Sequence, residues 1–434
     1  MKYYSTNHIA LEVDLEDAVV QGLASDRGLF MPERIEPMPF SFFEEIGTMT
    51  FQEISFEVAK KFFGEDIPES KLKQIVFDTL SFDTPLVQVN DNIYSLELFH
   101  GPTAAFKDVG ARFMARLLSY YLGQEKKMVN VLVATSGDTG SAVANGFLGV
   151  EGIHVHVLYP KGKVSEIQEK QFTTLGRNIT ALEVNGTFDD CQALVKSAFM
   201  DNSLKEKITI TSANSINVAR FLPQAFYYFN AFAKLKDKNR KIVFSVPSGN
   251  FGNLTAGLFA KKMELPVYQF IAANNRNDIV YNYLKTGIFD PRPSVSTIAN
   301  AMDVGDPSNF ARILDLYHNS HEAISKVMVG TTYNDDQIRE TLLSVYNTTG
   351  YLLDPHGAVG YRALNELLKD DETGIFLETA HPAKFTETVE GIVGKGNVPM
   401  PEKLLEFMKG TKKSITLEPD YNMFLDYLSQ LEKI

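Results

Sequence analysis

The chain has 434 residues, more than one hydrophobic core usually serves, so we expect two or three domains. Hydrophobic residues make up 44% and charged residues 22%, and no apolar run approaches the roughly 18 residues that span a bilayer. A net charge of −12 without a dense basic stripe argues against nucleic-acid binding, and the single cysteine, Cys191, excludes an internal disulfide and a thiolate zinc cluster.

The first 80 or so residues differ in pattern from the rest. The opening, MKYYSTNHIALEVDLEDAV, is polar and acidic and has neither the apolar core of a signal peptide nor the arginine-rich pattern of a transit peptide. Together with the single cysteine, this predicts a cytoplasmic protein. Helical patterns follow at 51–64 and 71–80 beside the Pro-rich stretch IEPMPF, so we expect a separate N-terminal cap with little chemistry.

Beyond this segment, apolar β-branched runs alternate with Gly, Ser or Thr turns and helical patterns. This alternation predicts strand–loop–helix units around mainly parallel sheets. The clearest expected strands are 129–136, 153–160, 241–248, 266–275 and 374–382. Each ends where small polar residues begin, which is where open α/β sheets place their ligands. The last 35 residues are charged and amphipathic and predict terminal helices.

Lys107 lies in the segment ELFHGPTAAFKDVGARF, directly after small residues and at the expected start of a helix. Gly101, Thr103 and the two alanines before Phe106 remove side-chain bulk around one amine, as a flat cofactor packed against the backbone would require. A solvated lysine in the first helical turn is the alternative, because lysine is mostly exposed. The flanks favour a functional lysine.

The segment TSGDTG at 135–140 joins an expected strand to an expected helix. Its hydroxyls and free backbone N–H groups suit an anion such as a carboxylate. The alternative is an N-capped helix with glycine in the tight turn, for which the same residues are typical. It is not a Walker A loop, since no GK[ST] follows.

The segment SANSIN at 212–217 is followed by Arg220. Asn214, Ser215 and Arg220 are close enough in sequence to converge on one phosphate, with the guanidinium supplying a fork that matches its oxygens. The alternative is a polar loop that caps the next helix.

The segment SGNFGN at 248–253 again lies between an expected strand and a helix. Two glycines three residues apart allow successive N–H groups to close around a phosphate at the positive end of a helix. A plain turn is the alternative. The segment lacks the G-x-G-x-x-G pattern and trailing acidic residue of a dinucleotide site.

The last expected strand runs into ETAHPAKF at 378–385. His381 has no partner at metal-ligand spacing, so we expect a packed or capping histidine and no metal site.

Five ordered motifs, HGPTAAFKD, TSGDTGSA, SANSIN with its arginine, VPSGNFGN and ETAHPAKF, resemble threonine synthase. The segments GLASDRGLFMPE, IANAMDVGDPSNF and DPHGAVGYRAL are similar to the longer, bacterial and fungal form of that family, so the resemblance covers almost the whole chain. The family belongs to the tryptophan-synthase-β-like group of pyridoxal-phosphate enzymes.

The resemblance implies two parallel-sheet α/β domains with pyridoxal 5′-phosphate at their interface, plus the N-terminal cap. The implied domains are an N-terminal domain at 1–85, a larger α/β domain at 86–108 and 226–434, and a smaller one at 109–225. The implied reaction turns O-phospho-L-homoserine and water into L-threonine and phosphate by β,γ-elimination and β-hydration.

Residue roles are carried over from the same resemblance. The implied cofactor-binding residues are Lys107, Asp138, Ser248, Gly249, Asn250, Phe251, Gly252, Asn253 and Thr379. The implied substrate-binding residues are Thr135, Ser136, Gly137, Thr139, Lys163, Ser165, Asn214, Ser215 and Arg220. Lys107 is the catalytic residue and forms the Schiff base, the 249–253 loop binds the cofactor phosphate, and the Thr379 hydroxyl meets the pyridine nitrogen. The 135–139 loop meets the substrate carboxylate, and Arg220 with its neighbours meets the substrate phosphate.

One position departs from the wider group. Many relatives carry Asn where this chain has Asp138, which leaves the protonation of that cofactor contact open. Two other functions also stay open: a phospholyase or dehydratase that releases a keto acid, and a non-catalytic pyridoxal-phosphate carrier. The phosphate cluster argues against a simple serine or threonine dehydratase, because a hydroxyl leaving group needs no phosphate site. We expect a small-molecule substrate and no nucleic-acid or membrane partner, and a monomer is compatible with the sequence.

Overall fold

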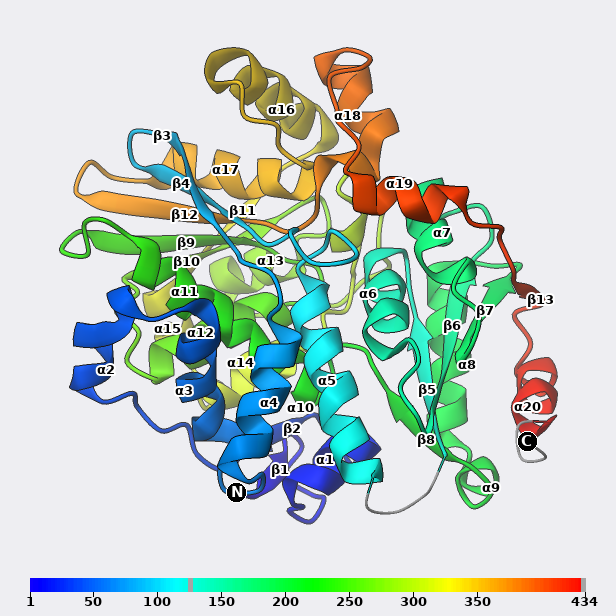
Figure 1. The fold of residues 1–434 in the computed structure, drawn as a ribbon. Coiled ribbons are helices and arrows are strands. Elements are labelled where there is room, and N and C mark those ends of the chain that lie inside the picture. The colour runs from blue at the N-terminus through cyan, green and yellow to red at the C-terminus, as the bar shows by residue number, and fades with distance from the viewer. Residues whose placement is uncertain (124–127, 431–434) are drawn as a thin grey trace.

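The computed structural model describes residues 1–123 and 128–430 of the chain. Two large sheets stand side by side, helix α5 (Lys107–Leu122) runs between them, and N-terminal helices pack beside it (Figure 1). Within the described residues, no helix combines the length and apolar character needed to cross a bilayer.

The larger sheet has six strands in the order β11-β10-β9-β12-β4-β3. All neighbours run parallel apart from the β3–β4 hairpin. The strands are β3 (Leu86–Asn90), β4 (Ile93–Glu97), β9 (Lys241–Pro247), β10 (Gln269–Asn274), β11 (Met328–Thr332) and β12 (Glu372–Glu378). Val243 packs with helix α17 (Pro355–Leu367) on one face, whereas its neighbour Phe244 packs against Tyr228 of helix α11 (Ala225–Lys234) on the other. Burial on both faces explains why these strands are continuous apolar runs.

The smaller sheet has five parallel strands in the order β13-β7-β6-β5-β8. They are β5 (Val129–Ala134), β6 (Ile153–Pro160), β7 (Ile179–Val184), β8 (Thr209–Ser212) and β13 (Ile415–Leu417). Helices α6 (Asp138–Phe147) and α7 (Glu166–Thr173) cover one face, and α8 (Phe188–Met200) with α20 (Tyr421–Gln430) the other (Figure 1). The five strands expected from sequence are β5, β6, β9, β10 and β12, and the prediction of parallel α/β sheets is confirmed.

The N-terminal cap is present but is not detached from the rest. It contains β1 (Tyr3–Ser5), α1 (Leu15–Gln21), β2 (Phe30–Pro32), α2 (Phe40–Glu45), α3 (Phe51–Phe63) and α4 (Glu69–Thr79), of which α3 and α4 were expected. The rings of Phe63 and Phe113 in α5 lie 4.9 Å apart, so the cap and the α5 helix share one hydrophobic core. Short amphipathic helices cannot bury their apolar faces alone, which explains this shared core.

The C-terminal segment returns to the smaller sheet. Helix α19 (Glu402–Lys409) packs against α7, β13 pairs with β7, and Phe424 of α20 joins the apolar cluster of α8. The terminal helices are confirmed, whereas β13 was not expected. The proposed division puts 226–434 with the larger sheet; we keep it as a proposal, with the segment from Ile415 onward assigned to the smaller sheet.

The remaining elements connect these layers. The helices are α9 (Asn202–Lys205), α10 (Val218–Phe221), α12 (Gly252–Lys262), α13 (Ile279–Thr286), α14 (Phe310–Leu316), α15 (His321–Val327), α16 (Asp335–Thr349) and α18 (Thr386–Val393). The 3-10 turns are η1 (Ile46–Thr48), η2 (Leu222–Gln224), η3 (Asn300–Met302) and η4 (Pro382–Phe385).

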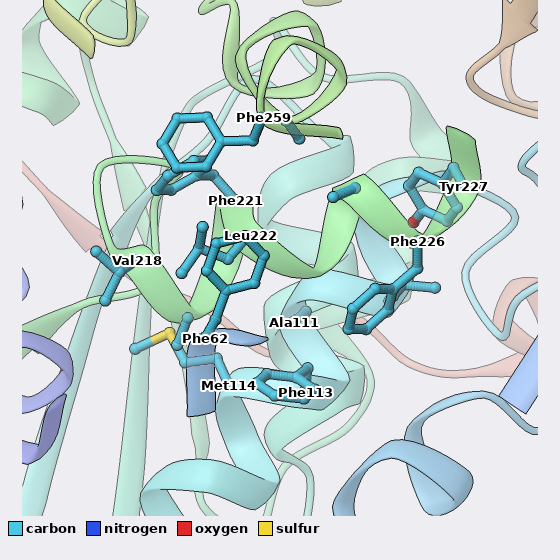
Figure 2. Packing of buried hydrophobic residues seen from close by; sticks show 14 of the residues in the cluster. Phe62, Ala111, Phe113, Met114, Val218, Phe221, Leu222, Phe226, Tyr227 and Phe259 are labelled. Atoms are coloured by element: carbon cyan, nitrogen blue, oxygen red, sulfur yellow. The ribbon is translucent and has the colours of Figure 1, made fainter. Parts of the chain in front are cut away.

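A cluster of large side chains fixes the helices that carry the candidate site. Phe113 of α5 meets Phe226 of α11 at 6.2 Å, and Phe221 of α10 meets Phe259 of α12 at 5.3 Å, both edge to face (Figure 2). Such aromatic pairs are tightly packed and resist displacement. These pairs hold α5 against α11 and α10 against α12.

Candidate active site

Lys107 begins α5, as expected, directly after a tight turn. Ala104 in that turn has φ +56°, a left-handed conformation that alanine rarely adopts. Ala105 bridges to Ala380, and the Phe106 N–H donates to the Thr379 carbonyl at 2.8 Å. Lys107 and Thr379, which are distant in sequence, are thereby brought to the same place.

The Lys107 side chain is partly buried and lies among charged groups of the protein. Burial lowers its pKa, the Asp138 carboxylate raises it, and the positive charges of Arg220 and Lys384 lower it, so that the result is about 8. About a tenth of this amine is therefore unprotonated at pH 7, far more than for a lysine with an ordinary pKa, and a nucleophile or a general base requires that form.

The 249–253 loop presents a run of unused donors at the start of α12. Among the described residues, none of the five successive backbone N–H groups from 249 to 253 donates to a protein acceptor. Phe251 at φ +60° turns the chain into the helix. A Cβ on Gly249 would lie 2.8 Å from the Ala301 carbonyl oxygen, so only glycine fits there. Converging free N–H groups at a helix start are suited to a phosphate.

Asn250 and Asn253 hold this loop in shape. Asn253 accepts from the Ser248 hydroxyl at 2.5 Å, and Asn250 Nδ2 donates to the Ser215 hydroxyl at 2.7 Å. Ser215 belongs to the 212–217 loop, and it also accepts from Asn309 Nδ2 at 3.1 Å. The two loops expected to bind the two phosphates are thus in direct contact.

The 135–140 loop closes on the hydroxyl of Thr135. This oxygen accepts from the N–H groups of Gly137 and Gly140 at 2.9 and 2.8 Å. Gly137 has φ +142°, and a Cβ there would meet Gln168 at 2.5 Å. Among the described residues, the side-chain hydroxyls of Ser136 and Thr139 have no hydrogen-bond partner, so they are available to a ligand.

Asp138 forms a buried ion pair with a residue that the sequence did not single out. Lys384 Nζ lies 2.6 Å from Asp138 Oδ1, and Gln168 Nε2 donates to the same oxygen at 2.9 Å. Burial raises the pKa of Asp138, but the charges of Lys384 and Lys107 outweigh it and lower the pKa to about 2. The two lysine charges thus favour the carboxylate form of Asp138.

Arg220 is 2% exposed and lies close enough to lower the pKa of Lys107. Its Nη1 donates to the Ala213 carbonyl, whereas its buried Nε has no partner among the described residues. Asn214 Nδ2 donates to the Ala134 carbonyl at 3.1 Å, next to the 135–140 loop. An unused buried donor on a guanidinium is a feature that an incoming anion would satisfy.

Lys163 and Ser165 occupy different places. Lys163 is exposed, and its charge acts on Asp190 at the start of α8; among the described residues, its side chain makes no hydrogen bond or ion pair with another candidate residue. Ser165 caps α7 and donates to Gln168 Oε1 at 2.9 Å, which connects it to Asp138 through Gln168. His381 caps η4 by accepting from the Ala383 N–H at 3.1 Å, which confirms the capping prediction.

The site fits the cofactor that the sequence resemblance implies. A half-buried amine at Lys107 provides an attachment point, and the free N–H groups of 249–253 suit its phosphate. The Thr379 side chain is 6% exposed, and its hydroxyl has no hydrogen-bond partner among the described residues, so it is available to a ring nitrogen.

Known proteins were compared with the whole chain. The family model for pyridoxal-phosphate dependent enzymes matches residues 79–375, between matches to the threonine synthase N terminus at 2–80 and the threonine synthase C-terminal region at 357–427. The threonine synthase of Haemophilus influenzae is 46% identical over 429 residues, which are 99% of each chain. This chain belongs to the threonine synthase family.

Solved threonine synthase structures agree over the full length. The crystal structure from Escherichia coli superposes with a TM-score of 0.93 at 41% identity, covering 99% of this chain and 100% of that one. The pyridoxal-phosphate-bound threonine synthase from Brucella melitensis gives 0.93 at 34% identity, covering 100% of both. As a member of the threonine synthase family, the chain is a pyridoxal-phosphate-dependent lyase.

Sequence reasoning missed four residues that shape this threonine synthase site: Gln168, Asn309, Arg312 and Lys384. Arg312 is fully buried and donates to the Ser215 and Ile216 carbonyls at 3.0 and 2.5 Å. Lys384 lies in the motif ETAHPAKF. A lysine between Ala383 and Phe385, just after an apolar strand, could have identified it from the sequence. Gln168 and Arg312 had no such signal, because each lies in an ordinary helical pattern.

Proposed function

We propose that this chain converts O-phospho-L-homoserine and water into L-threonine and phosphate, with Lys107 as its catalytic residue. The observation that carries the proposal is the presence of two separate groups of unused donors in one site that also holds a reactive amine. The backbone N–H groups of 249–253 form the first group, and the buried Nε of Arg220 belongs to the second. A phosphorylated cofactor and a phosphorylated substrate together require two such groups.

Lys107, the 249–253 loop and Thr379 would hold pyridoxal phosphate through its carbonyl carbon, its phosphate and its ring nitrogen. When bound, the cofactor supplies an electron sink for the chemistry at Cα and Cβ of the substrate. A neutral hydroxyl at Thr379, rather than a carboxylate, favours an unprotonated ring nitrogen.

Lys107 serves twice in the proposed reaction. Its amine would hold the cofactor, and the same amine would act on the substrate when it is free. The free amine, with its pKa lowered to about 8, acts as a general base at Cα and next at Cβ. Lysines with an ordinary pKa would be almost fully protonated at neutral pH and unable to take these protons.

The polar loops orient the substrate around that amine. The 135–139 loop meets the carboxylate through Ser136, Thr139 and free N–H groups, while Asn214, Ser215 and Arg220 meet the phosphate. Holding both ends places Cα and Cβ within reach of one base. Phosphate leaves Cγ by C–O cleavage, Cγ gains a proton, and water adds its oxygen to Cβ while Cα is reprotonated.

Turnover in heavy-oxygen water tests the proposal. The expected products are threonine with solvent oxygen at Cβ and phosphate without it, measured together by mass spectrometry. Labelled phosphate with homoserine would indicate a phosphatase, and a keto acid with ammonia would indicate a phospholyase or dehydratase; either contradicts the proposal. Lys107→Ala is the matched control and should form neither product, and a cofactor carrier would form none with the native chain.

The finer organisation is proposed on the same basis. The division at 85/86, 108/109 and 225/226 follows the two sheets, apart from the C-terminal return. We expect a cytoplasmic protein, and a monomer is compatible with the sequence. Burial raises the pKa of the Cys191 thiol to about 12, which favours the unreactive protonated thiol.

A further inference from the structure

A buried ion pair joins the two α/β units beside Lys107. Lys384 lies in η4, which follows β12 of the six-stranded sheet, and Asp138 begins α6, which follows β5 of the five-stranded sheet. The side chains are 0% and 3% exposed. Removing two charges from water costs free energy that good geometry only partly offsets, so such a pair is weak evidence for a stabilising role. Its position next to the reactive amine is evidence for another role.

Both partners are fixed by further contacts. Lys384 Nζ donates to the Thr103 carbonyl at 3.0 Å, in the turn that precedes Lys107. Gln171 Nε2 donates to the same carbonyl at 2.9 Å, and Gln168 holds Asp138 from the side of α7. Neither charged group is therefore free to swing away from the other.

We propose that Lys384 is a positioning residue: by pairing with Asp138 across the two units, it keeps that carboxylate ionised and fixed, and the two charges together set the protonation of Lys107. The inference rests on the proposed catalytic role of Lys107. It assigns Lys384 no contact with substrate or cofactor.

The charges around the pair define the expected signs. Lys107 is faced by Asp138, which raises its pKa, and by Arg220 and Lys384, which lower it. Lys384 is faced in addition by Asp108 and Lys403. Because Asp138 and Lys384 act on Lys107 in opposite directions, removing one or the other must shift the protonation of Lys107 in opposite directions. A purely structural pair would give no such pattern.

The test measures the pH midpoint at which Lys107 reacts with acetic anhydride in the full chain freed of cofactor, with peptide mapping by mass spectrometry. Asp138→Asn should lower the midpoint by about one pH unit, because the attracting carboxylate is gone. Lys384→Met should raise it, and Lys384→Arg should leave it unchanged. In the holoenzyme, the acid limb of the kcat/KM profile should move in the same directions.

Two further variants distinguish a change in the protonation of Lys107 from a misfolded chain. The double variant D138N/K384M leaves neither member of the ion pair as a buried charge without its partner, and its midpoint should rise relative to Asp138→Asn alone. Lys403→Met is the matched control, since Lys403 is also partly buried and donates to the Phe99 and Gly101 carbonyls at 3.0 and 2.8 Å. That control should leave the midpoint unchanged.

Opposite shifts for the Asp138 and Lys384 variants support the inference. Equal shifts, no shift, or a double variant identical to Asp138→Asn overturn it. The labelling of Lys107 requires no turnover. A chain that made no threonine would therefore refute the proposed function, but the pH midpoints of Lys107 could still be measured and compared.

Discussion

Arg220 makes far less use of its donors than a buried arginine usually does. Its guanidinium carries five N–H groups, yet among the described residues only the Ala213 carbonyl accepts from it. Burial lowers its pKa to about 10, so it stays charged at neutral pH. A buried, charged and mostly unpaired group is stabilised when an anion arrives.

We therefore expect Arg220→Ala to weaken substrate capture. The KM for O-phospho-L-homoserine should rise and kcat/KM should fall by a factor that corresponds to about 2–5 kcal/mol, as for the loss of one partner of a buried charge pair. Steady-state kinetics and a pyridoxal-phosphate titration of the same variant provide the measurement, and cofactor affinity should change little.

Arg116→Ala is the matched control, because Arg116 is a partly buried arginine of α5 whose side chain donates, among the described residues, only to the Arg112 carbonyl at 3.0 Å. Its kinetics should stay close to those of the native chain. Collapse of cofactor affinity in Arg220→Ala with an unchanged KM would mean that the two phosphate sites have been assigned the wrong way round.

Single residues differ in how far the sequence reveals them. Lys107 was identified from its small neighbours. A partly buried amine beside a flat ligand needs space, and the glycine and alanines before it in the sequence provide that space. Lys384 escaped notice, because its role depends on Asp138, which folding brings from another sheet. Lys163 was grouped with the site by resemblance, and the structure exposes it beside Asp190. A local sequence pattern does not show which residues of different α/β units come into contact.

Among the elements, the junction of β9 and α12 is the most constrained. A Cβ on Gly249 would approach the Ala301 carbonyl oxygen and Met302 Cα to 2.8 and 2.9 Å, and both are backbone atoms that cannot yield cheaply. Gly249→Ala should therefore displace the 249–253 loop. Overpacking of this kind costs about 1–3 kcal/mol.

The expected result of Gly249→Ala is a pyridoxal-phosphate dissociation constant at least about tenfold larger, since 1.4 kcal/mol is a factor of ten. Equilibrium titration of the cofactor measures it. Gly391→Ala is the matched control, because Gly391 lies in α18 and a Cβ there would meet no atom within 4 Å. An unchanged dissociation constant for Gly249→Ala would remove this loop from cofactor binding.

The strands that the sequence predicted are long apolar runs. The strands β5, β6, β9, β10 and β12 are covered on both faces, so apolar runs identified them. β13 was missed because it has three residues, two of them exposed, and forms only by pairing with the edge of β7. β1 and β2 are equally short and depend on each other.

At the scale of the molecule, Arg312 joins the N-terminal cap to the site. Its Nε and Nη2 donate to the Phe30 carbonyl at 3.2 and 3.1 Å, and its Nη1 donates to the Ser215 carbonyl. The guanidinium also lies 4.0 Å from the Phe221 ring centroid. One buried side chain thus links the cap, the 212–217 loop and α14.

Arg312→Met should lower the free energy of unfolding by about 3 kcal/mol or more, because several buried carbonyls lose their donor at about 1–3 kcal/mol each. The KM for the phosphorylated substrate should rise as well, since the 212–217 loop loses its anchor. Denaturant unfolding and steady-state kinetics measure the two effects. Arg339→Met is the control, because Arg339 is exposed and its ion pair is with Asp336, three residues earlier in the same helix. This variant should change the free energy of unfolding by less than about 0.5 kcal/mol. Native-like stability of Arg312→Met would contradict this role.

The sequence predicted the two-sheet plan and the presence of the cap but not how they share a core. Local periodicity identified α3 and α4, yet nothing in it records that Phe63 faces Phe113 of α5. Such long-range pairing is a property of the folded chain, which explains why the cap was expected to stand apart.

The position of β13 also has a consequence for synthesis. Ribosomes make a chain from its N-terminal to its C-terminal side, so β5 to β8 are complete long before Ile415 appears. The outer edge of β7 therefore carries unpaired backbone groups for most of translation, and exposed strand edges are sites of intermolecular pairing. Closure of this sheet therefore has to wait until β13 has been synthesised, and until then the edge of β7 is open to pairing with another strand.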